Sequence, residues 1–237
     1  MQYPTISEYV KASQDASDNL DMSTEATDEE LNEAITDEFG VKYSKDGRKL
    51  LKAPQELDRT YSIRKGTKIV CDMAFAYCKT LRNVVIPDSV TSIGGGAFNE
   101  CDSLRSVVIS DGVTSIGDGA FQFCSSLNDI IIPDSVTSIG IYAFGECSSL
   151  SSLVIPDSVT SIGDWAFYYC DALRSVVIPD GVTSIGVGAF IGCKSLKSLE
   201  IPDSVTSIGF GAFSYCYFPY KLKQELISRF GDKIFGN

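Results

Sequence analysis

The sequence predicts a mainly β solenoid in which 23-residue coils stack along one axis. Three columns of residues carry this prediction, because each recurs at every 23rd position without an insertion. A fixed period of this length is typical of repeat proteins whose units bury their apolar faces only by stacking on their neighbours. The columns are a cysteine column (Cys78, Cys101, Cys124, Cys147, Cys170, Cys193, Cys216), a phenylalanine column (Phe75, Phe98, Phe121, Phe144, Phe167, Phe190, Phe213) and an isoleucine column (Ile63, Ile86, Ile109, Ile132, Ile155, Ile178, Ile201).

Each unit begins with a segment whose spacing favours a short strand. In the unit at 104–109, a three-residue step is followed by alternation, so the inward residues can share one core. Pro-Asp then ends the strand in most units, because proline has no N–H to donate to a ladder. Val113 and Ile116 are expected to point inward again, and Gly117 to turn the chain with a positive φ. A short helical or irregular turn through Phe121 closes the coil, with Cys124 buried beneath it.

This unit, L-x-x-(V/I/L)-x-I-P-D-(S/G)-V-T-S-I-G-x-x-A-F-x-x-C, resembles the repeat of the bacterial BspA-like leucine-rich-repeat family, which treponemal leucine-rich proteins share. The resemblance covers residues 57–218, where roughly ten positions of each unit repeat in register. It implies a right-handed, strand-lined solenoid that binds proteins, often at the surface of anaerobic bacteria or of some protists. It also implies adhesion to extracellular host proteins.

The chain before the repeats is predicted to hold two different segments. Residues 1–26 form a mostly disordered stretch, in which the capping-box spacing of Thr5 and Glu8 favours a short helix. Residues 27–56 form a cap made of a helix and a β-hairpin. The helix begins at Thr27 and follows an i, i+4, i+8 stripe whose last member is Phe39.

The hairpin and the carboxy-terminal cap follow from equally local signals. Lys45-Asp-Gly-Arg48 lies between the segments 41–44 and 49–52, and Asp-Gly between apolar segments favours a hairpin. Residues 57–218 hold one degenerate and six regular repeats. Residues 219–237 form a capping helix, whose stripe of Leu222, Leu226 and Phe230 is stopped by Gly231. With a cover at both ends, the array is expected to be complete.

Charge and residue content exclude several classes of function. The net charge is −11, but residues 1–40 hold eleven acidic side chains against Lys11, which leaves 20 acidic and 19 basic residues in the rest. A nearly neutral array argues against nucleic-acid binding, which needs a basic stripe. The chain has no histidine, and no cysteine has a paired base, so we expect no enzyme, no cofactor and no metal site.

No secretory signal follows Met1, and no apolar run is long enough to cross a bilayer. As written, the chain is expected to be cytoplasmic, or else a processed or truncated piece of a surface or secreted protein.

The cysteine column is expected to form a ladder of buried, reduced thiols. Stacked coils bring equivalent cysteines within disulfide range, but their Cβ vectors run parallel and seven is an odd number, so disulfide pairing is the lesser alternative. Cys71 lies outside the column, where later units have Gly94 or Gly117, and it is the cysteine we expect to be exposed.

The strand face is the first candidate binding surface. The residue between the two inward positions of each strand points outward, and in five consecutive units it is β-branched and apolar. An apolar strip with a polar rim is typical of a protein-binding face, although β-propensity and mutual cover along the ladder explain the same residues without a partner. The predicted strip is Val85, Val108, Ile131, Val154 and Val177, with a basic rim of Arg82, Arg105, Arg174 and Lys197.

One aromatic patch and two further columns are weaker candidates for a binding site. The aromatic patch Tyr142, Trp165, Tyr168 and Tyr169 can anchor a partner or simply cover the phenylalanine column. The aspartate column, Asp88 to Asp203, is compatible with calcium but is better explained by turn chemistry. The Thr-Ser column that begins at Thr91 is compatible with ice binding only if both residues share a face, and neighbouring strand residues do not.

We therefore expect a non-catalytic, monomeric module that recognises a protein partner, whose identity the sequence does not give, along the strand face, with an adhesin-like role among the possibilities. The alternative is a structural spacer or scaffold without its own ligand. A cation-stiffened surface module is the third reading.

Overall fold

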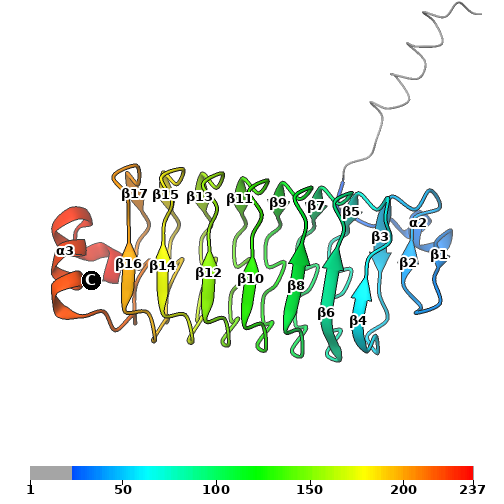
Figure 1. Ribbon diagram of the computed structural model, residues 1–237, viewed down its shortest axis with the longest axis horizontal. Coiled ribbons are helices and arrows are strands. Elements are labelled where there is room, and N and C mark those ends of the chain that lie inside the picture. Colours follow the sequence, from blue (N-terminus) through cyan, green and yellow to red (C-terminus); the bar gives the residue numbers. More distant parts are fainter. Residues whose placement is uncertain (1–22, 237) are drawn as a thin grey trace, which may run out of the picture.

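The computed structural model describes residues 23–236, which wind into an elongated β-solenoid of stacked coils with a different cover at each end (Figure 1). The predicted fold is therefore confirmed. Most of the segment predicted to be disordered, 1–26, lies outside the described residues. Among residues 23–236, no helix has the length and apolar character that a bilayer span requires.

Each coil contributes two strands rather than the single one predicted. The longer strands form one side of the solenoid: β4 (Arg59–Ser62), β6 (Leu81–Ile86), β8 (Ser106–Ile109), β10 (Asp129–Ile131), β12 (Ser152–Val154), β14 (Ser175–Val177) and β16 (Ser198–Glu200). The two-residue strands form another side: β5 (Ile69–Val70), β7 (Ser92–Ile93), β9 (Ser115–Ile116), β11 (Ser138–Ile139), β13 (Ser161–Ile162), β15 (Ser184–Ile185) and β17 (Ser207–Ile208).

All the strand pairs between coils are parallel, and the regular coils pair in a register of 23 residues. Val85 lies opposite Val108, and Ser138 lies opposite Ser161. The short strands join the amino-terminal hairpin in one ten-stranded sheet, whereas the long strands form three separate ladders, β4-β6-β8, β10-β12 and β14-β16. Equal spacing in the sequence thus becomes equal spacing along the solenoid axis.

The core is built from the predicted columns. The phenylalanines from Phe75 to Phe213 are fully buried and stack face to face, with ring centroids from 4.9 Å apart for Phe75 and Phe98 to 5.6 Å apart for Phe190 and Phe213. The cysteines of the column are free thiols, six buried and Cys216 half-buried, as predicted. Stacked aromatic and thiol columns fill the same space in every coil, so each coil covers the next.

Two local predictions were wrong. Cys71 is buried, because the hairpin lies beside it and its N–H donates to the carbonyl of Leu50 at 2.9 Å. Gly117 does not have the predicted positive φ. It is needed because the coils approach closely there: a Cβ would lie 2.7 Å from the carbonyl carbon of Gly94. The left-handed turn comes two residues later, at Gly119, where φ is +61°.

The amino-terminal helix is shorter than predicted. Helix α2 spans only Asp28–Asn32, although the predicted capping box between Thr27 and Glu30 is present. Residues 35–36 form strand β1 instead, so the helical stripe does not reach Phe39, which is 57% exposed. Strand β1 (Ile35–Thr36) pairs with β2 (Lys42–Tyr43), and β2 pairs with β3 (Lys49–Lys52), both antiparallel. The predicted hairpin is thus confirmed, and it extends the ten-stranded sheet past the first coil.

The carboxy-terminal cover is confirmed as helical. Helix α3 (Tyr220–Phe230) ends at Gly231 and is followed by the 3-10 helix η1 (Asp232–Phe235). The last coil donates its turn N–H groups to η1: Phe213 bonds to the carbonyl of Ile234 at 2.8 Å, and Gly211 to that of Lys233 at 2.8 Å. The cover therefore satisfies the donors that a further coil would have satisfied.

Candidate binding face

The longer strands place one apolar row on the outside of the solenoid. Side chains on both sides of each outward residue are buried in the core, so alternation along the strand fixes its direction. The parallel register then sets neighbours opposite one another, as for Ile131 and Val154. Exposed fractions are 37% for Val85, 53% for Val108, 75% for Ile131, 65% for Val154 and 57% for Val177.

These exposed fractions test whether the side chains of the row shield one another from solvent along the ladder. If each β-branched side chain shielded its neighbour, the middle members would be the least exposed. Instead Ile131 and Val154 are the most exposed of the five. The central members of the row thus present the most apolar surface to solvent. The row ends at β16, where Glu200 occupies the equivalent position.

The predicted basic rim lies where the long strands begin, and its members are all exposed. They fall into two pairs of neighbouring coils: the N–H of Arg105 bonds to the carbonyl of Arg82 at 2.8 Å, and that of Lys197 to the carbonyl of Arg174 at 2.9 Å. Lys197 is not free, because its Nζ donates to the carbonyl of Tyr217 at 2.6 Å. The aspartate column occupies the turns at the other end of the strands, so the apolar row has an acidic edge along its length and a basic edge that is interrupted at Asn128 and Ser151.

A shallow hollow of about 410 Å³ adjoins the carboxy-terminal end of this row. Its lining combines apolar residues with carboxylates: Asp157, Val177, Ile178, Pro179, Asp180, Glu200, Ile201 and Pro202. It extends the row toward the acidic edge.

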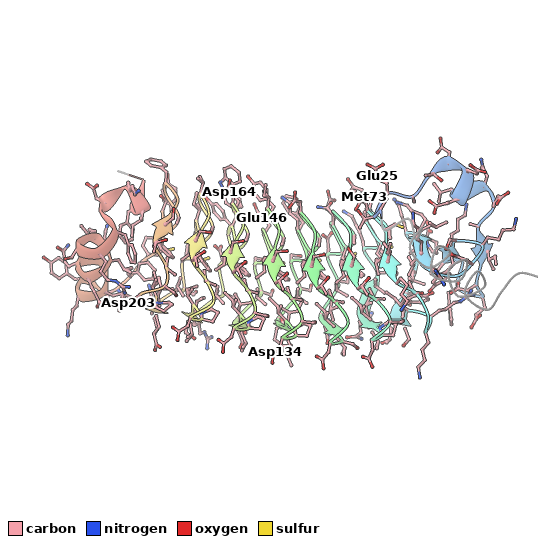
Figure 2. All side chains as sticks on the ribbon, turned by 90° about the horizontal axis from the view of Figure 1, so that it is seen from above. Glu25, Met73, Asp134, Glu146, Asp164 and Asp203 are labelled. Atoms are coloured by element: carbon pink, nitrogen blue, oxygen red, sulfur yellow. The ribbon has the colours of Figure 1, made fainter. Side chains whose placement is uncertain are left out.

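The predicted aromatic patch is brought together on a different side, the side formed by the closing turns. Figure 2 shows Asp134 and Asp203 on one edge and Met73, Glu146 and Asp164 on the opposite edge. Tyr142 stacks on Trp165 with ring centroids 5.1 Å apart, and its ring meets the edge of Tyr168 at 5.9 Å. Tyr168 contacts Tyr169 at 4.5 Å. All four rings are half-buried and contact one another.

The threonine column has a structural role. Thr114 Oγ1 donates to the carbonyl of Thr91 at 3.1 Å, and the later threonines repeat this bond from coil to coil. Within residues 23–236, no three His, Cys, Asp or Glu side chains gather in a way that could hold a metal ion.

The prediction missed one feature of the turn side. A hollow of about 330 Å³ lies beside the aromatic patch and is lined by Met73, Gly96, Asn99, Asp118, Gly119, Gln122, Ile141 and Tyr142. The signal was present in the sequence, since Tyr142 and Trp165 replace glycine at positions two residues after the Ser-Ile-Gly of each unit.

Comparison with known proteins decides the family. The family model described as BspA type leucine rich repeat region, in six copies, matches residues 59–174 and 160–237. The chain belongs to this family. The matched residues include most of the solenoid, as the sequence resemblance predicted, and also its carboxy-terminal cover.

Solved structures of leucine-rich repeat proteins are similar to the chain. A T. pallidum leucine-rich repeat protein is 32% identical, with a TM-score of 0.73, 86% of this chain covered and 95% of that one. A leucine-rich repeat protein from Eubacterium ventriosum is 29% identical, with a TM-score of 0.72, 78% of this chain covered and 50% of that one. A leucine-rich cell surface protein from Faecalibacterium prausnitzii is 37% identical, with a TM-score of 0.66, 78% of this chain covered and 52% of that one.

The chain thus spans about half the length of the latter two proteins. No curated protein matched it.

Proposed function

We propose that this chain is a non-catalytic module that binds a protein partner along its strand face. The observation that carries the proposal is the exposed apolar row from Val85 to Val177, which rises to 75% exposure at Ile131. A contiguous apolar strip bordered by charge is the composition expected of a protein-binding surface. Its parallel strands are locked by the core, so the surface is preformed and little ordering opposes binding.

The two charged edges support a protein as the ligand. Basic residues begin the strands at both ends of the row and aspartates follow every strand, so a partner with acidic and basic groups on opposite sides of an apolar ridge fits in one orientation. A membrane or nucleic-acid surface carries one sign of charge and matches only one edge.

The proposed role is adhesin-like, at a cell surface. Its support is the 37% identity to a protein described as a leucine-rich cell surface protein. The module acts as a monomer in this proposal, because β1–β3 and α3 with η1 close the two ends of the solenoid. The competing function is a spacer, in which the same row has no partner.

The test places a photo-crosslinking amino acid at Ile131 in the full chain and, as a matched control, at Ser138. Both positions are exposed on strands, but Ser138 belongs to the ten-stranded sheet. The chain is incubated with cells and irradiated. We expect a discrete adduct with one of their surface proteins from position 131 and none from position 138.

The purified partner is then titrated against the triple variant Val108→Thr, Ile131→Thr and Val154→Thr, which keeps β-branching and makes the three central members of the row polar. Affinity should fall at least about tenfold. Unchanged affinity of a folded triple variant, or equal crosslinking at both positions, contradicts binding along the strand face, and the absence of any adduct at either position supports the spacer.

A further inference from the structure

One column on the turn side mixes glycine with large side chains although every member has a left-handed backbone. For most residues other than glycine this conformation costs about 1–2 kcal/mol. The chain nevertheless places tyrosine and tryptophan there in two adjacent coils. The column is Met73 (φ 56°), Gly96 (58°), Gly119 (61°), Tyr142 (53°), Trp165 (52°), Gly188 (61°) and Gly211 (64°).

Side chains in this column lean over the following coil. A Cβ on Gly96 would lie 2.3 Å from the Sδ of Met73, and a Cβ on Gly188 would lie 2.6 Å from the indole of Trp165. The glycines after Met73 and Trp165 are therefore already covered. Tyr142 leans in the same direction, onto Trp165.

No side chain of the column covers Gly119. A Cβ placed there meets only the side chain of Gln122, at 3.3 Å. Because one face of the Tyr142 ring lies on Trp165, with 11° between the planes, the other face is turned toward the coil of Gly119. Tyr142 and Gly119 both line the hollow of about 330 Å³, which we name the Tyr142 slot.

The slot has apolar ends and polar sides. Met73 and Tyr142 lie at the two ends in the order of the coils, with Gly96 and Gly119 between them, and Ile141 also lines the slot. Successive coils are about 5 Å apart, so the space between the leaning Met73 and the Tyr142 ring spans about two coils, roughly 10 Å. That length accommodates one six-membered ring stacked on tyrosine.

The polar sides offer both donors and acceptors. Asn99 and Gln122 are half-buried and lie side by side, with Asn99 Nδ2 3.5 Å from Gln122 Oε1. Asp118 is held in place because its Oδ1 accepts the N–H of Ile141 at 2.7 Å. An amide presents two donors and one acceptor oxygen, and a carboxylate presents only acceptors.

We propose that the Tyr142 slot binds a hexopyranose unit of a glycan. A pyranose ring has a face of C–H groups, which packs on an aromatic face, and a rim of hydroxyl groups, which both donate and accept hydrogen bonds. Asn99, Gln122 and Asp118 match the rim, and Tyr142 matches the C–H face. The volume lies at the lower end of the range of small-molecule sites.

The alternative occupants fit the slot less well. An aromatic side chain of a protein would stack on Tyr142 but would offer no partner to the amide groups of Asn99 and Gln122 beyond the hydrogen bond that they make to each other, which costs binding energy. An anionic group would face the Asp118 carboxylate, and no lysine or arginine lines the slot. The slot and the strand face use different residues, so the glycan proposal does not depend on the protein-binding proposal.

The chain supplies its own reporter for the test. Trp165 is the single tryptophan of the sequence, and it stacks directly on Tyr142. The intact protein is titrated with soluble oligosaccharides of glucose, galactose, mannose and N-acetylglucosamine while tryptophan emission and, in parallel, heat of binding are recorded. We expect saturable binding of at least one of the four, with a Kd below about 10 mM.

Two variants locate the binding. Tyr142→Gly restores the residue that Gly119 and Gly188 have in the same column, so the left-handed backbone accepts it and the variant should still fold, although it loses the contact with Trp165. Gly119→Tyr repeats the natural Tyr142 one coil earlier and closes the slot. Both should weaken saccharide binding at least about tenfold, whereas the triple threonine variant of the strand face should bind saccharide as the parent does.

The proposal is overturned if none of the four oligosaccharides binds, or if binding survives in folded Tyr142→Gly and Gly119→Tyr. Binding of a tyrosine-rich peptide that both variants abolish, without binding of any saccharide, would assign the slot to a protein partner and would equally overturn it.

Discussion

The thiol of Cys124 donates a hydrogen bond to the backbone carbonyl of Phe98 in the preceding coil, with Sγ and O 3.2 Å apart. The same bond links cysteine to phenylalanine in the later coils, from Cys147 and Phe121 to Cys216 and Phe190. Burial raises the pKa of the Cys78 thiol to about 11 and those of Cys147 and Cys216 to about 12. The column is therefore held as neutral thiols that donate, and it adds directional bonds to the packing between coils.

Thiol alkylation should be slow in the folded protein. With a pKa near 12 rather than the ordinary 9.0, Cys147 has about a thousandfold less thiolate near neutral pH, and its side chain is also buried. Iodoacetamide followed by peptide mass spectrometry should label Cys216, the half-buried member, before Cys124 and Cys147. The denatured chain provides the control, with all cysteines labelled at similar rates. Rapid labelling of Cys124 in the native protein would contradict the buried column.

Alkaline pH should destabilise the protein through the same column. A raised folded-state pKa means that the unfolded chain loses its thiol proton first, so the stabilisation is complete below pH 9 and is lost as the pH rises toward 12. Each fully buried thiol should lower the free energy of unfolding by about 1.4 kcal/mol per pH unit in that window. Denaturant midpoints measured against pH should fall less steeply in Cys147→Ala, whatever its stability at neutral pH. An unchanged slope would show that this thiol does not contribute.

Close approach of the coils makes some glycines irreplaceable without any requirement for positive φ. A Cβ on Gly117 would lie 2.7 Å from the carbonyl carbon of Gly94 and 2.8 Å from the nitrogen of Gly95, both backbone atoms that cannot move alone. Gly117→Ala should lower the free energy of unfolding by about 1–3 kcal/mol or more, measured by chemical denaturation. Gly95→Ala is the matched control, because its Cβ would meet nothing closer than the carbonyl oxygen of Asp118 at 3.4 Å. Equal effects of the two substitutions would contradict the steric explanation.

The sequence predicted best those features that repeat. The phenylalanine and cysteine columns were predictable because one period fixes the height and direction of every equivalent side chain, as the stacking of Phe98 on Phe121 at 5.1 Å shows. The prediction of a helix that reaches Phe39 was wrong because it rested only on local spacing. Ile35 and Thr36 instead pair with Tyr43 and Lys42 in a sheet. Cys71 was misplaced for the same reason, since the neighbouring Leu50 belongs to the hairpin.

Of the candidate surfaces, the strand face could be predicted from the sequence and the Tyr142 slot could not. The direction of the apolar row followed from alternation, so Ile131 and Val154 were predictable as outward residues. The Tyr142 slot was not predicted, because it depends on the direction in which Met73 and Tyr142 lean and on the missing side chain of Gly119 between them. A single period gives the column but not the rotamers of its irregular members.

The amino-terminal cover depends on a buried chain of hydroxyl groups. Tyr61 donates its O–H to Asp37 Oδ2 at 2.6 Å, so the hydroxyl of Tyr43, also 2.6 Å away, is the donor to Tyr61. Burial and then the hydrogen bond to Asp37 raise the pKa of Tyr61, which keeps the phenol neutral. The other carboxylate oxygen of Asp37 accepts the N–H of Val41 at 2.8 Å, which fixes the turn between β1 and β2.

Tyr61→Phe should therefore loosen the cover before it affects the repeats. The substitution removes both hydrogen bonds and leaves the Tyr43 hydroxyl buried without an acceptor, which should cost about 1–3 kcal/mol. Hydrogen exchange should show the loss in β1–β3 first, because terminal units of a solenoid open independently of its centre. Tyr77→Phe is the control, since Tyr77 is 40% exposed and its hydroxyl can bond to water. If exchange in Tyr61→Phe accelerates equally in β11 and β13, the hydroxyl chain is not a local clamp and the solenoid unfolds as one unit from this end.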